Sequence, residues 1–396
     1  MQELVDKYAD KLGHAKLVEP GQALVSGLDA QLVWNRDDPA CDVLEEVMAG
    51  LNINSLVFAR PAEPYWTIIE HLAARHYPTI EPQDCETRTF LHDLPVACNF
   101  TAQEMISILK QRKSCIVPGH GITASGTVSP EQGFVTFSSV CFASFVKFFF
   151  DFLSTLSNTG QQQPDAGLHD LFLRVAHMTQ DLLPLPETPP DLASGPFDTP
   201  DQVRTAMIQA GRYTVEYGLV DSYFGNISCL HNNILYISQT GSSLDELAGC
   251  IDPSPLDGSS SAGLTASSEL SAHLGVIRST GKQTILHGHP KFAVIQSMVC
   301  HEKDCENRGQ CHLVCSHDRI LGDIPVVPGE VGTGPYGLCH TLPPAMAGRR
   351  GVIVHGHGLF TVGETDYTDA FASLLDVEAD CRKSYFDQVH ALLAKL

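Results

Sequence analysis

The chain has 396 residues, of which 43% are hydrophobic and 18% charged, so it can bury a large core. At roughly 100–200 residues per domain, this length predicts two domains. Lysine and arginine total 25 against 46 acidic residues, which gives a formal net charge of −21. This charge argues against a general binder of nucleic acid or anionic membranes. A small anionic ligand would need backbone amides, hydroxyls or a metal to neutralise it.

The first residues, Met1 to Gly13, contain neither the apolar run nor the cleavage site of an export signal. The 13 cysteines are therefore expected to be thiols or metal ligands in a cytoplasmic protein. The apolar stretch from Phe134 to Phe150 is shorter than the roughly 20 residues that a membrane span requires, and it contains Lys147. It predicts a helix buried in a core or a subunit interface.

A polar and proline-rich segment divides the chain. We expect one domain over residues 1–153, a helical and proline-rich linker over 154–199, and a second domain over 200–396. Thr199 as the N-cap, Pro200 as the first helical residue and Gln202 three positions after the cap predict a helix to about Tyr217.

The two halves contain related segments in the same order. Residues 115–126 (CIVPGHGITASG) align with residues 352–363 (VIVHGHGLFTVG), and residues 56–61 (LVFARP) align with residues 285–290 (ILHGHP). The apolar helix after the first glycine motif also has a counterpart near the C-terminus. The second half is longer between these anchors, where a cysteine-rich stretch lies. This pattern indicates two related units.

The second unit contains a candidate metal site. Residues 285–290 predict a short strand that ends in His-Gly-His, and the alternation of a strand turns His287 and His289 to the same face. A third histidine, His357, lies in a glycine-flanked turn, and Glu269 lies near a predicted helix N-terminus. Zinc takes such imidazole ligands. With 18 histidines in the chain, the pair could equally be an ordinary surface feature.

Six short motifs of the second unit, in order, resemble the class II aldolase/adducin family, which contains L-fuculose-phosphate aldolase. They are Tyr223-Phe-Gly-Asn226, Gln239-Thr240-Gly241-Ser-Ser243, Ser267-Ser268-Glu269, His287-Gly-His289-Pro290, Gly322-Asp-Ile-Pro325 and Gly356-His357-Gly358. The resemblance implies an α/β fold of two tandem domains of this type, each a central, mainly antiparallel sheet flanked by helices.

The resemblance implies one catalytic zinc ion on His287, His289 and His357, with Glu269 as the acid/base carboxylate. The implied reaction cleaves or forms a carbon–carbon bond in a small, phosphorylated hydroxy-carbonyl or sugar compound through an enediolate. It also places a phosphate near a set of hydroxyls and amides. These belong to Asn226, Thr240, Gly241, Ser267 and Ser268. The alternative for this set is an ordinary N-cap and turn.

Other interpretations stay open at this point. The same zinc fold serves dehydratases and epimerases of ketose phosphates, although the epimerases of the family carry aspartate at the position of Glu269. An adducin-like scaffold without chemistry is a further alternative. The tyrosine that aldolases of the family use as a proton donor has no clean counterpart here, and Tyr385 is a weak substitute.

The first unit retains little of this site. Phe58 aligns with His287, Arg60 with His289 and Ala40 with Glu269, so that only His120 survives. We therefore expect a degenerate, non-catalytic copy. Family members place active sites between subunits of a four-fold ring, so the resemblance implies a homo-oligomer, with a pseudo-four-fold dimer as one form.

Four cysteines lie close together in the longer interval: Cys300, Cys305, Cys311 and Cys315. Four thiols within sixteen residues could hold a structural zinc ion or an iron–sulfur cluster. Their spacing fits no common finger or ferredoxin pattern. A reduced, cysteine-rich loop is the alternative.

Overall fold

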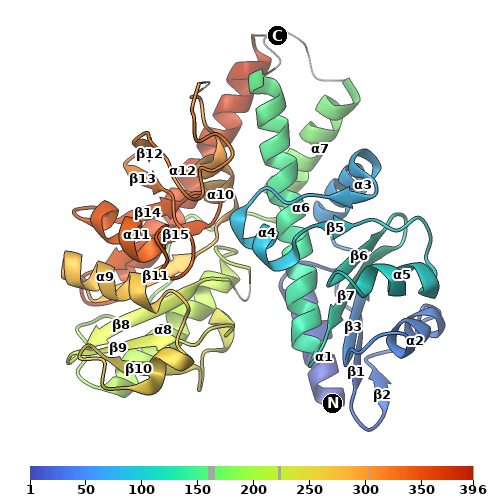
Figure 1. Cartoon of the computed structure of the whole chain (residues 1–396), viewed down its shortest axis with the longest axis horizontal. Coiled ribbons are helices and arrows are strands. Elements are labelled where there is room, and N and C mark those ends of the chain that lie inside the picture. Colours follow the sequence, from blue (N-terminus) through green and yellow to red (C-terminus); the bar gives the residue numbers. More distant parts are fainter. Residues whose placement is uncertain (159–165, 222–223, 303, 396) are drawn as a thin grey trace. The chain divides into compact units, whose positions relative to one another are not determined.

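The computed structural model describes residues 1–158, 166–221, 224–302 and 304–395. The chain divides into two compact units, of which unit 1 comprises residues 1–152 and 164–184, and unit 2 comprises residues 153–163 and 185–396. Each unit contains an antiparallel or mainly antiparallel sheet with helices packed against it (Figure 1). The expected mixed α/β fold with mainly antiparallel sheets is confirmed.

Unit 1 is built on a five-stranded sheet in the order β2-β1-β3-β7-β6, in which every neighbouring pair is antiparallel. Strands β4 and β5 form a separate small ladder, and Val96, directly after β5, bridges to Ile116 of β6. The strands are β1 (Leu24–Leu28), β2 (Leu32–Trp34), β3 (Ser55–Ala59), β4 (Thr79–Ile80), β5 (Leu94–Pro95), β6 (Ser114–Val117) and β7 (Gly121–Gly126). The helices are α1 (Gln2–His14), α2 (Cys41–Ala49), α3 (Tyr65–His76), α4 (Cys85–Leu91), α5 (Ala102–Leu109), α6 (Pro130–Asn158) and α7 (Ala166–Leu182).

Helix α6 contains the apolar stretch singled out in the sequence. It is long and apolar enough to cross a membrane by length and composition, and 94% of its most apolar window is buried in the protein. Inside unit 1 its aromatic rings pack against Tyr8, Tyr65 and Phe172. Lys147, its one basic residue, is buried and forms an ion pair with Asp151 at 2.8 Å. The expectation of a helix buried in a core is thus confirmed within unit 1.

Unit 2 is built on an eight-stranded sheet in the order β10-β9-β8-β11-β15-β14-β13-β12, with one parallel pair, β13 and β14. The strands are β8 (Asn226–His231), β9 (Ile234–Ser238), β10 (Ile251–Pro255), β11 (Thr284–Gly288), β12 (Arg319–Leu321), β13 (Ile324–Val327), β14 (Gly351–Val354) and β15 (Gly358–Gly363). The helices are α8 (Pro200–Glu216), α9 (Leu270–Thr280), α10 (Lys291–Met298), α11 (Leu338–Met346) and α12 (Thr368–Leu393), with short 3-10 turns η1 (Leu244–Glu246) and η2 (Ser261–Leu264).

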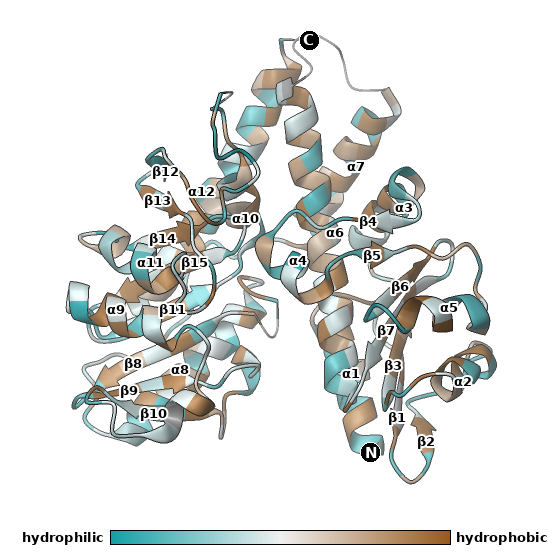
Figure 2. Ribbon diagram, in the orientation of Figure 1, coloured by the Kyte–Doolittle hydropathy of each residue, from teal (hydrophilic) through white to brown (hydrophobic). Residues whose placement is uncertain are grey.

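The centre of this sheet is apolar. All residues of β14 and β15 are buried, and β14 is coloured as hydrophobic in Figure 2. Helices α9 and α11 pack on one another and close a core around Ile285, Val352 and Phe360. Strands β11 and β15, which carry or flank the predicted histidines, therefore lie in the buried centre of the unit.

The start of α8 confirms the capping pattern predicted from the sequence. The Thr199 hydroxyl accepts a hydrogen bond from the Gln202 amide at 3.3 Å, and the Gln202 side chain accepts one from the Thr199 amide at 3.2 Å. We expect Thr199→Ala to lower the free energy of unfolding by about 1 kcal/mol, because the first turn then loses its side-chain acceptor. Urea denaturation measures this loss, and an unchanged midpoint would contradict the role of the cap.

Candidate functional site

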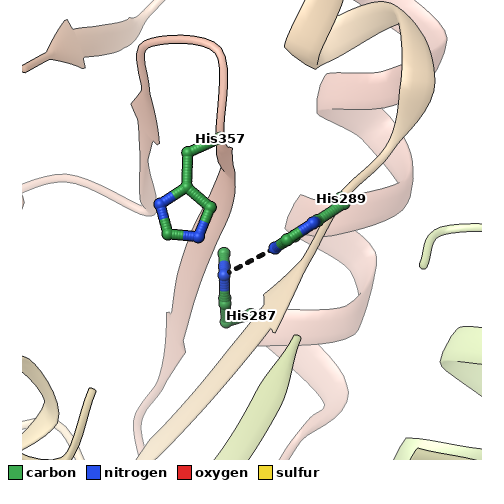
Figure 3. A group of neighbouring side chains, drawn as sticks. All are labelled: His287, His289 and His357. Atoms are coloured by element: carbon green, nitrogen blue, oxygen red, sulfur yellow. Dashed lines mark hydrogen bonds between the residues drawn. The ribbon is translucent and has the colours of Figure 1, made fainter. Parts of the chain in front are cut away.

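Three histidine rings converge at one end of the central strands of unit 2 (Figure 3). His287 lies in β11, His289 follows this strand directly, and His357 lies in the turn between β14 and β15. All three are buried, and one ligand nitrogen from each lies within 4.8 Å of the others. The Nε2 atoms of His287 and His289 are 3.0 Å apart. The structure thus brings together the three residues that the sequence suggested as ligands.

The His287 ring is held in a defined tautomer. Its Nδ1 is 3.0 Å from the Leu359 carbonyl oxygen, which can only accept, so Nδ1 carries the proton and the Nε2 lone pair faces the other histidines. Burial, together with the neighbouring His289 and His357, holds the pKa of His287 well below its usual value. A neutral imidazole with a free lone pair is the form that binds a metal ion.

Aromatic rings fix two of the histidines from outside. Phe360, the register partner of His287 across β11 and β15, stacks on the His287 ring at 3.7 Å between centroids. Phe224 stacks on His289 at 5.5 Å. Neither contact was predicted from the sequence. The contact between Phe360 and His287 could have been predicted from the position of Phe360, two residues after Gly358.

Gly358 allows the turn that carries His357 to approach His287 and His289 closely. An ideal Cβ at Gly358 would lie 2.5 Å from the Gly288 carbonyl oxygen, 2.6 Å from His289 Cδ2 and 2.7 Å from His287 Cε1. The Gly-His-Gly pattern around His357 therefore has a steric reason, because no larger residue fits between the turn and the histidine pair.

Glu269 faces the histidines from the N-terminus of α9, where it is the N-cap residue. Its carboxylate oxygens lie 3.6 Å from His287 Nε2 and 3.4 Å from His357 Nε2. The side chain is buried, and the Asn226 amide donates a hydrogen bond to it at 2.6 Å. This arrangement places one carboxylate beside the three rings with its orientation fixed by Asn226.

The candidate phosphate residues lie beside Glu269. The end of β9 and the segment before α9 pair through Gln239 and Ala266, so the Thr240-Gly241 turn adjoins Ser267 and Ser268. Thr240, Gly241 and Ser268 are at least partly exposed, whereas Asn226 and Ser267 are buried. The structure therefore gathers the five residues that the sequence proposed. Tyr223, at the start of their first motif, lies outside the described residues.

Helix α9 begins at Leu270, directly after Glu269, and the residues directly before Glu269 are not helical. The Ser267 amide instead donates to the Ser238 carbonyl at 2.9 Å, and Ala266 bridges to Gln239. Pairing with the end of β9 thus holds this segment extended, while the Ser267 hydroxyl accepts from the Glu269 amide at 3.3 Å.

Two further histidines, and Tyr385, have structural roles. His273 is fully buried, contacts the Ser228 hydroxyl at 2.7 Å, and burial lowers its pKa to about 3. His355 contacts Arg319 and the Ser297 carbonyl, and burial lowers its pKa to about 4. Tyr385 is fully buried among Phe292 and Phe386, which fits packing rather than proton donation.

The four cysteines of the candidate second metal site lie between α10 and β12, and each is half-buried with a free thiol. Among the residues that the structure describes, only His287, His289 and His357 form a group of three or more ligands within reach of one ion. Metal binding by the cysteines stays a prediction. Lys303, within this stretch, lies outside the described residues.

A buried carboxylate that the sequence analysis missed holds the helix after the histidine pair. Glu378 of α12 accepts hydrogen bonds from the amides of Phe292 and Ala293, at 3.0 and 2.8 Å, at the N-terminus of α10. Burial raises the pKa of Glu378 to about 7 from its ordinary 4.5. The folded protein therefore binds this proton more tightly than the unfolded chain does.

The contribution of Glu378 to stability is full below pH 4.5 and is lost as the pH rises through about 7. Glutamine does not titrate, so the Glu378→Gln variant lacks this pH dependence. Between pH 5 and pH 8 we expect the unfolding free energy of the wild type to fall by on the order of 2 kcal/mol relative to that of the variant. Denaturant titrations at both pH values measure this shift. Parallel pH profiles would contradict it.

The fold and the geometry of these side chains together define unit 2 as an α/β domain with a buried three-histidine centre that could hold a metal ion. Residues 205–385 match the family model described as Class II Aldolase and Adducin N-terminal domain. This part of the chain, which lies within unit 2, is therefore similar to the class II aldolase/adducin family. The family resemblance seen in the sequence is confirmed.

Solved structures of similar fold cover about half of the chain. L-fuculose-1-phosphate aldolase from Thermus thermophilus is 23% identical over 48% of this chain and 97% of its own, with a TM-score of 0.39. YgbL from Escherichia coli, described as a putative aldolase/epimerase/decarboxylase, is 19% identical over 46% and 88%, with a TM-score of 0.38. A sugar-phosphate aldolase from Thermotoga maritima is 18% identical over 48% and 95%, with a TM-score of 0.34. A comparison with curated proteins found no match.

Proposed function

We propose that unit 2 is a zinc-dependent lyase of the class II aldolase type. The observation that carries this proposal is the convergence of His287, His289 and His357 beside the buried carboxylate of Glu269. Three buried imidazoles, with ligand nitrogens within 4.8 Å of one another and a carboxylate beside them, are a donor set of the type that zinc takes in proteins. The donor set therefore fits zinc.

The three histidines would hold the ion, which would act as a Lewis acid toward the substrate's carbonyl and hydroxyl oxygens. Glu269 would move the proton at the carbon atom whose bond is broken or made, since its carboxylate lies within 3.6 Å of the Nε2 atoms of His287 and His357. Asn226 keeps this carboxylate oriented through its 2.6 Å hydrogen bond. Phe224 and Phe360 cover the histidine rings and limit the access of water.

The substrate class follows from charge and exposure. In a chain of net charge −21, an anionic group would be received by hydroxyls and amides rather than by a basic patch. The accessible Thr240-Gly241 turn and Ser268 adjoin the segment that carries Glu269, and their hydroxyls and amides suit a phosphate. We therefore propose a small phosphorylated hydroxy-carbonyl or sugar compound, cleaved through an enediolate.

Cleavage of L-fuculose 1-phosphate and related ketose 1-phosphates by the intact chain tests this proposal. We expect two smaller carbonyl products in equal amounts, and no products from the His287→Ala, His289→Ala variant. One product that has lost water would make the domain a dehydratase, and one isomeric product would make it an epimerase. A metal-free wild-type protein without turnover would favour an adducin-like scaffold.

We further propose that the protein is a cytoplasmic homo-oligomer. None of the 13 cysteines, all of which the structure describes, forms a disulfide, which suits a reducing compartment. Light scattering on the intact chain tests the oligomer, with a pseudo-four-fold dimer as the proposed form. A mass of one chain would contradict it.

A further inference from the structure

The sheet of unit 1 repeats the strand order of unit 2. The order β2-β1-β3-β7-β6 matches β9-β8-β11-β15-β14, and all matched pairs are antiparallel. Helices occupy the same places in the element order of both units. The matched pairs of helices are α1 with α8, α2 with α9, α3 with α10, α5 with α11, and α6 with α12.

The pairing registers of the two sheets agree residue by residue, without a slip. A register error of one residue would reverse every side chain, so agreement across several ladders is a strict test. The matched pairs are Ser55–Gly126 with Thr284–Gly363, Phe58–Thr123 with His287–Phe360, Val117–Gly121 with Val354–Gly358, and Leu24–Phe58 with Asn226–His287.

The two cores are built from the same positions. We align the two units by the related segments of the sequence, residues 56–61 with 285–290 and residues 115–126 with 352–363. Buried residues of the unit 1 core cluster then fall on buried residues of the unit 2 core cluster. The corresponding residues are Val47 with Val276, Met48 with Ile277, Leu56 with Ile285, Met105 with Leu342, Leu109 with Met346, Cys115 with Val352, and Val117 with Val354.

The turn that carries the third histidine is also shared. Gly119 and Gly356 both adopt a positive φ, at +77° and +61°. A Cβ at Gly121 would collide with the Ala59 carbonyl oxygen, as one at Gly358 would collide with that of Gly288. His120 thus has the backbone environment of His357.

We propose that unit 1 is a second copy of the unit 2 domain whose metal pocket has been replaced by a packed aromatic cluster. At the positions of Asn226, Glu269, His287 and His289, unit 1 carries Leu24, Ala40, Phe58 and Arg60. Ala40 is the N-cap residue of α2, as Glu269 is of α9. Only His120, at the place of His357, is kept.

The rings fill the space that the ligands would enclose. Phe100 lies 5.0 Å from Phe58 and stacks on His120 at 5.1 Å with an interplanar angle of 13°. By the offset of the glycine motif, Phe100 stands where unit 2 has Gly337, which carries no side chain. Arg60 packs over the Trp66 ring at 5.0 Å. Unit 1 thus keeps the backbone of the metal site, but it lacks the ligands except His120, and aromatic rings fill the space between them.

Restoring the ligands tests this inference. In the full chain with His287→Ala and His289→Ala, we introduce Ala40→Glu, Phe58→His, Arg60→His and Phe100→Gly, and measure zinc by elemental analysis. We expect the zinc content to rise by about one per chain above that of the His287→Ala, His289→Ala protein. The matched control carries Phe58→Ala, Arg60→Ala and Phe100→Gly in the same background, and its zinc content should equal that of the background protein. A folded restored variant without this additional zinc would overturn the inference.

A second experiment tests the inference even if the restored variant does not fold. His120→Ala in the otherwise wild-type chain should leave the zinc content and any turnover unchanged, since His120 belongs to a packed cluster. Loss of zinc or of turnover would overturn the inference. The zinc content of the wild-type chain is measured separately, so failure of the proposed unit 2 site is distinguished from failure of this one.

Discussion

Glu269→Gln is expected to reduce turnover by about 10²–10⁴-fold, the usual contribution of a positioned acid/base group. The substitution keeps the size of the side chain, and a glutamine oxygen can still accept from the Asn226 amide, which donates to Glu269 at 2.6 Å. The amide cannot carry the proton that the carboxylate would move. Fold and zinc content should therefore remain, while turnover is lost.

Steady-state kinetics and elemental analysis of the same preparation measure both effects. Glu364→Gln is the matched control, because Glu364 is an exposed carboxylate of unit 2 that pairs with Lys282. It should leave turnover within about two-fold, as most surface substitutions do. Full turnover by Glu269→Gln would exclude Glu269 as the proton carrier. Simultaneous loss of zinc would make Glu269 a ligand instead.

Gly358→Ala is the second substitution with a large expected effect. The added methyl group would lie within 2.7 Å of the Gly288 carbonyl oxygen and of both His287 and His289. The histidines must shift, and displacement of reacting groups by about 1 Å can cost about 10²-fold in rate. Forced packing adds about 1–3 kcal/mol of destabilisation. We expect weaker zinc binding, slower turnover and a lower melting temperature.

Gly334→Ala is the matched control for this change. Gly334 has no atom within 4 Å of an ideal Cβ, and its φ lies outside the left-handed region. Its substitution should leave zinc content, turnover and melting temperature near those of the wild type. Equal behaviour of the two alanine variants would show that the approach of the turn to the histidine pair is not required.

Local signals explain what the sequence predicts well. The Thr199-Pro200-Gln202 cap lies within one helical turn, and the alternation that turns His287 and His289 to one side lies within one strand. Both depend on neighbours along the chain. That His357 joins His287 and His289 could be predicted only from its glycine motif and from the family resemblance.

Long-range contacts explain what the sequence does not predict. The Leu359 carbonyl that sets the His287 tautomer and the Glu378 carboxylate that binds the start of α10 lie on strands and helices distant in sequence. Nothing near Glu378 in the sequence marks it as a helix cap. Likewise, Phe100 reaches His120 only because the fold of unit 1 brings them together.

The central claim is that His287, His289 and His357 hold one metal ion. Elemental analysis of the intact chain and of the His287→Ala, His289→Ala variant tests it most directly. The account predicts loss of about one zinc per chain with the fold retained by circular dichroism, and any remaining metal would belong to the cysteines at 300–315. An unchanged metal content in the folded variant would contradict the claim.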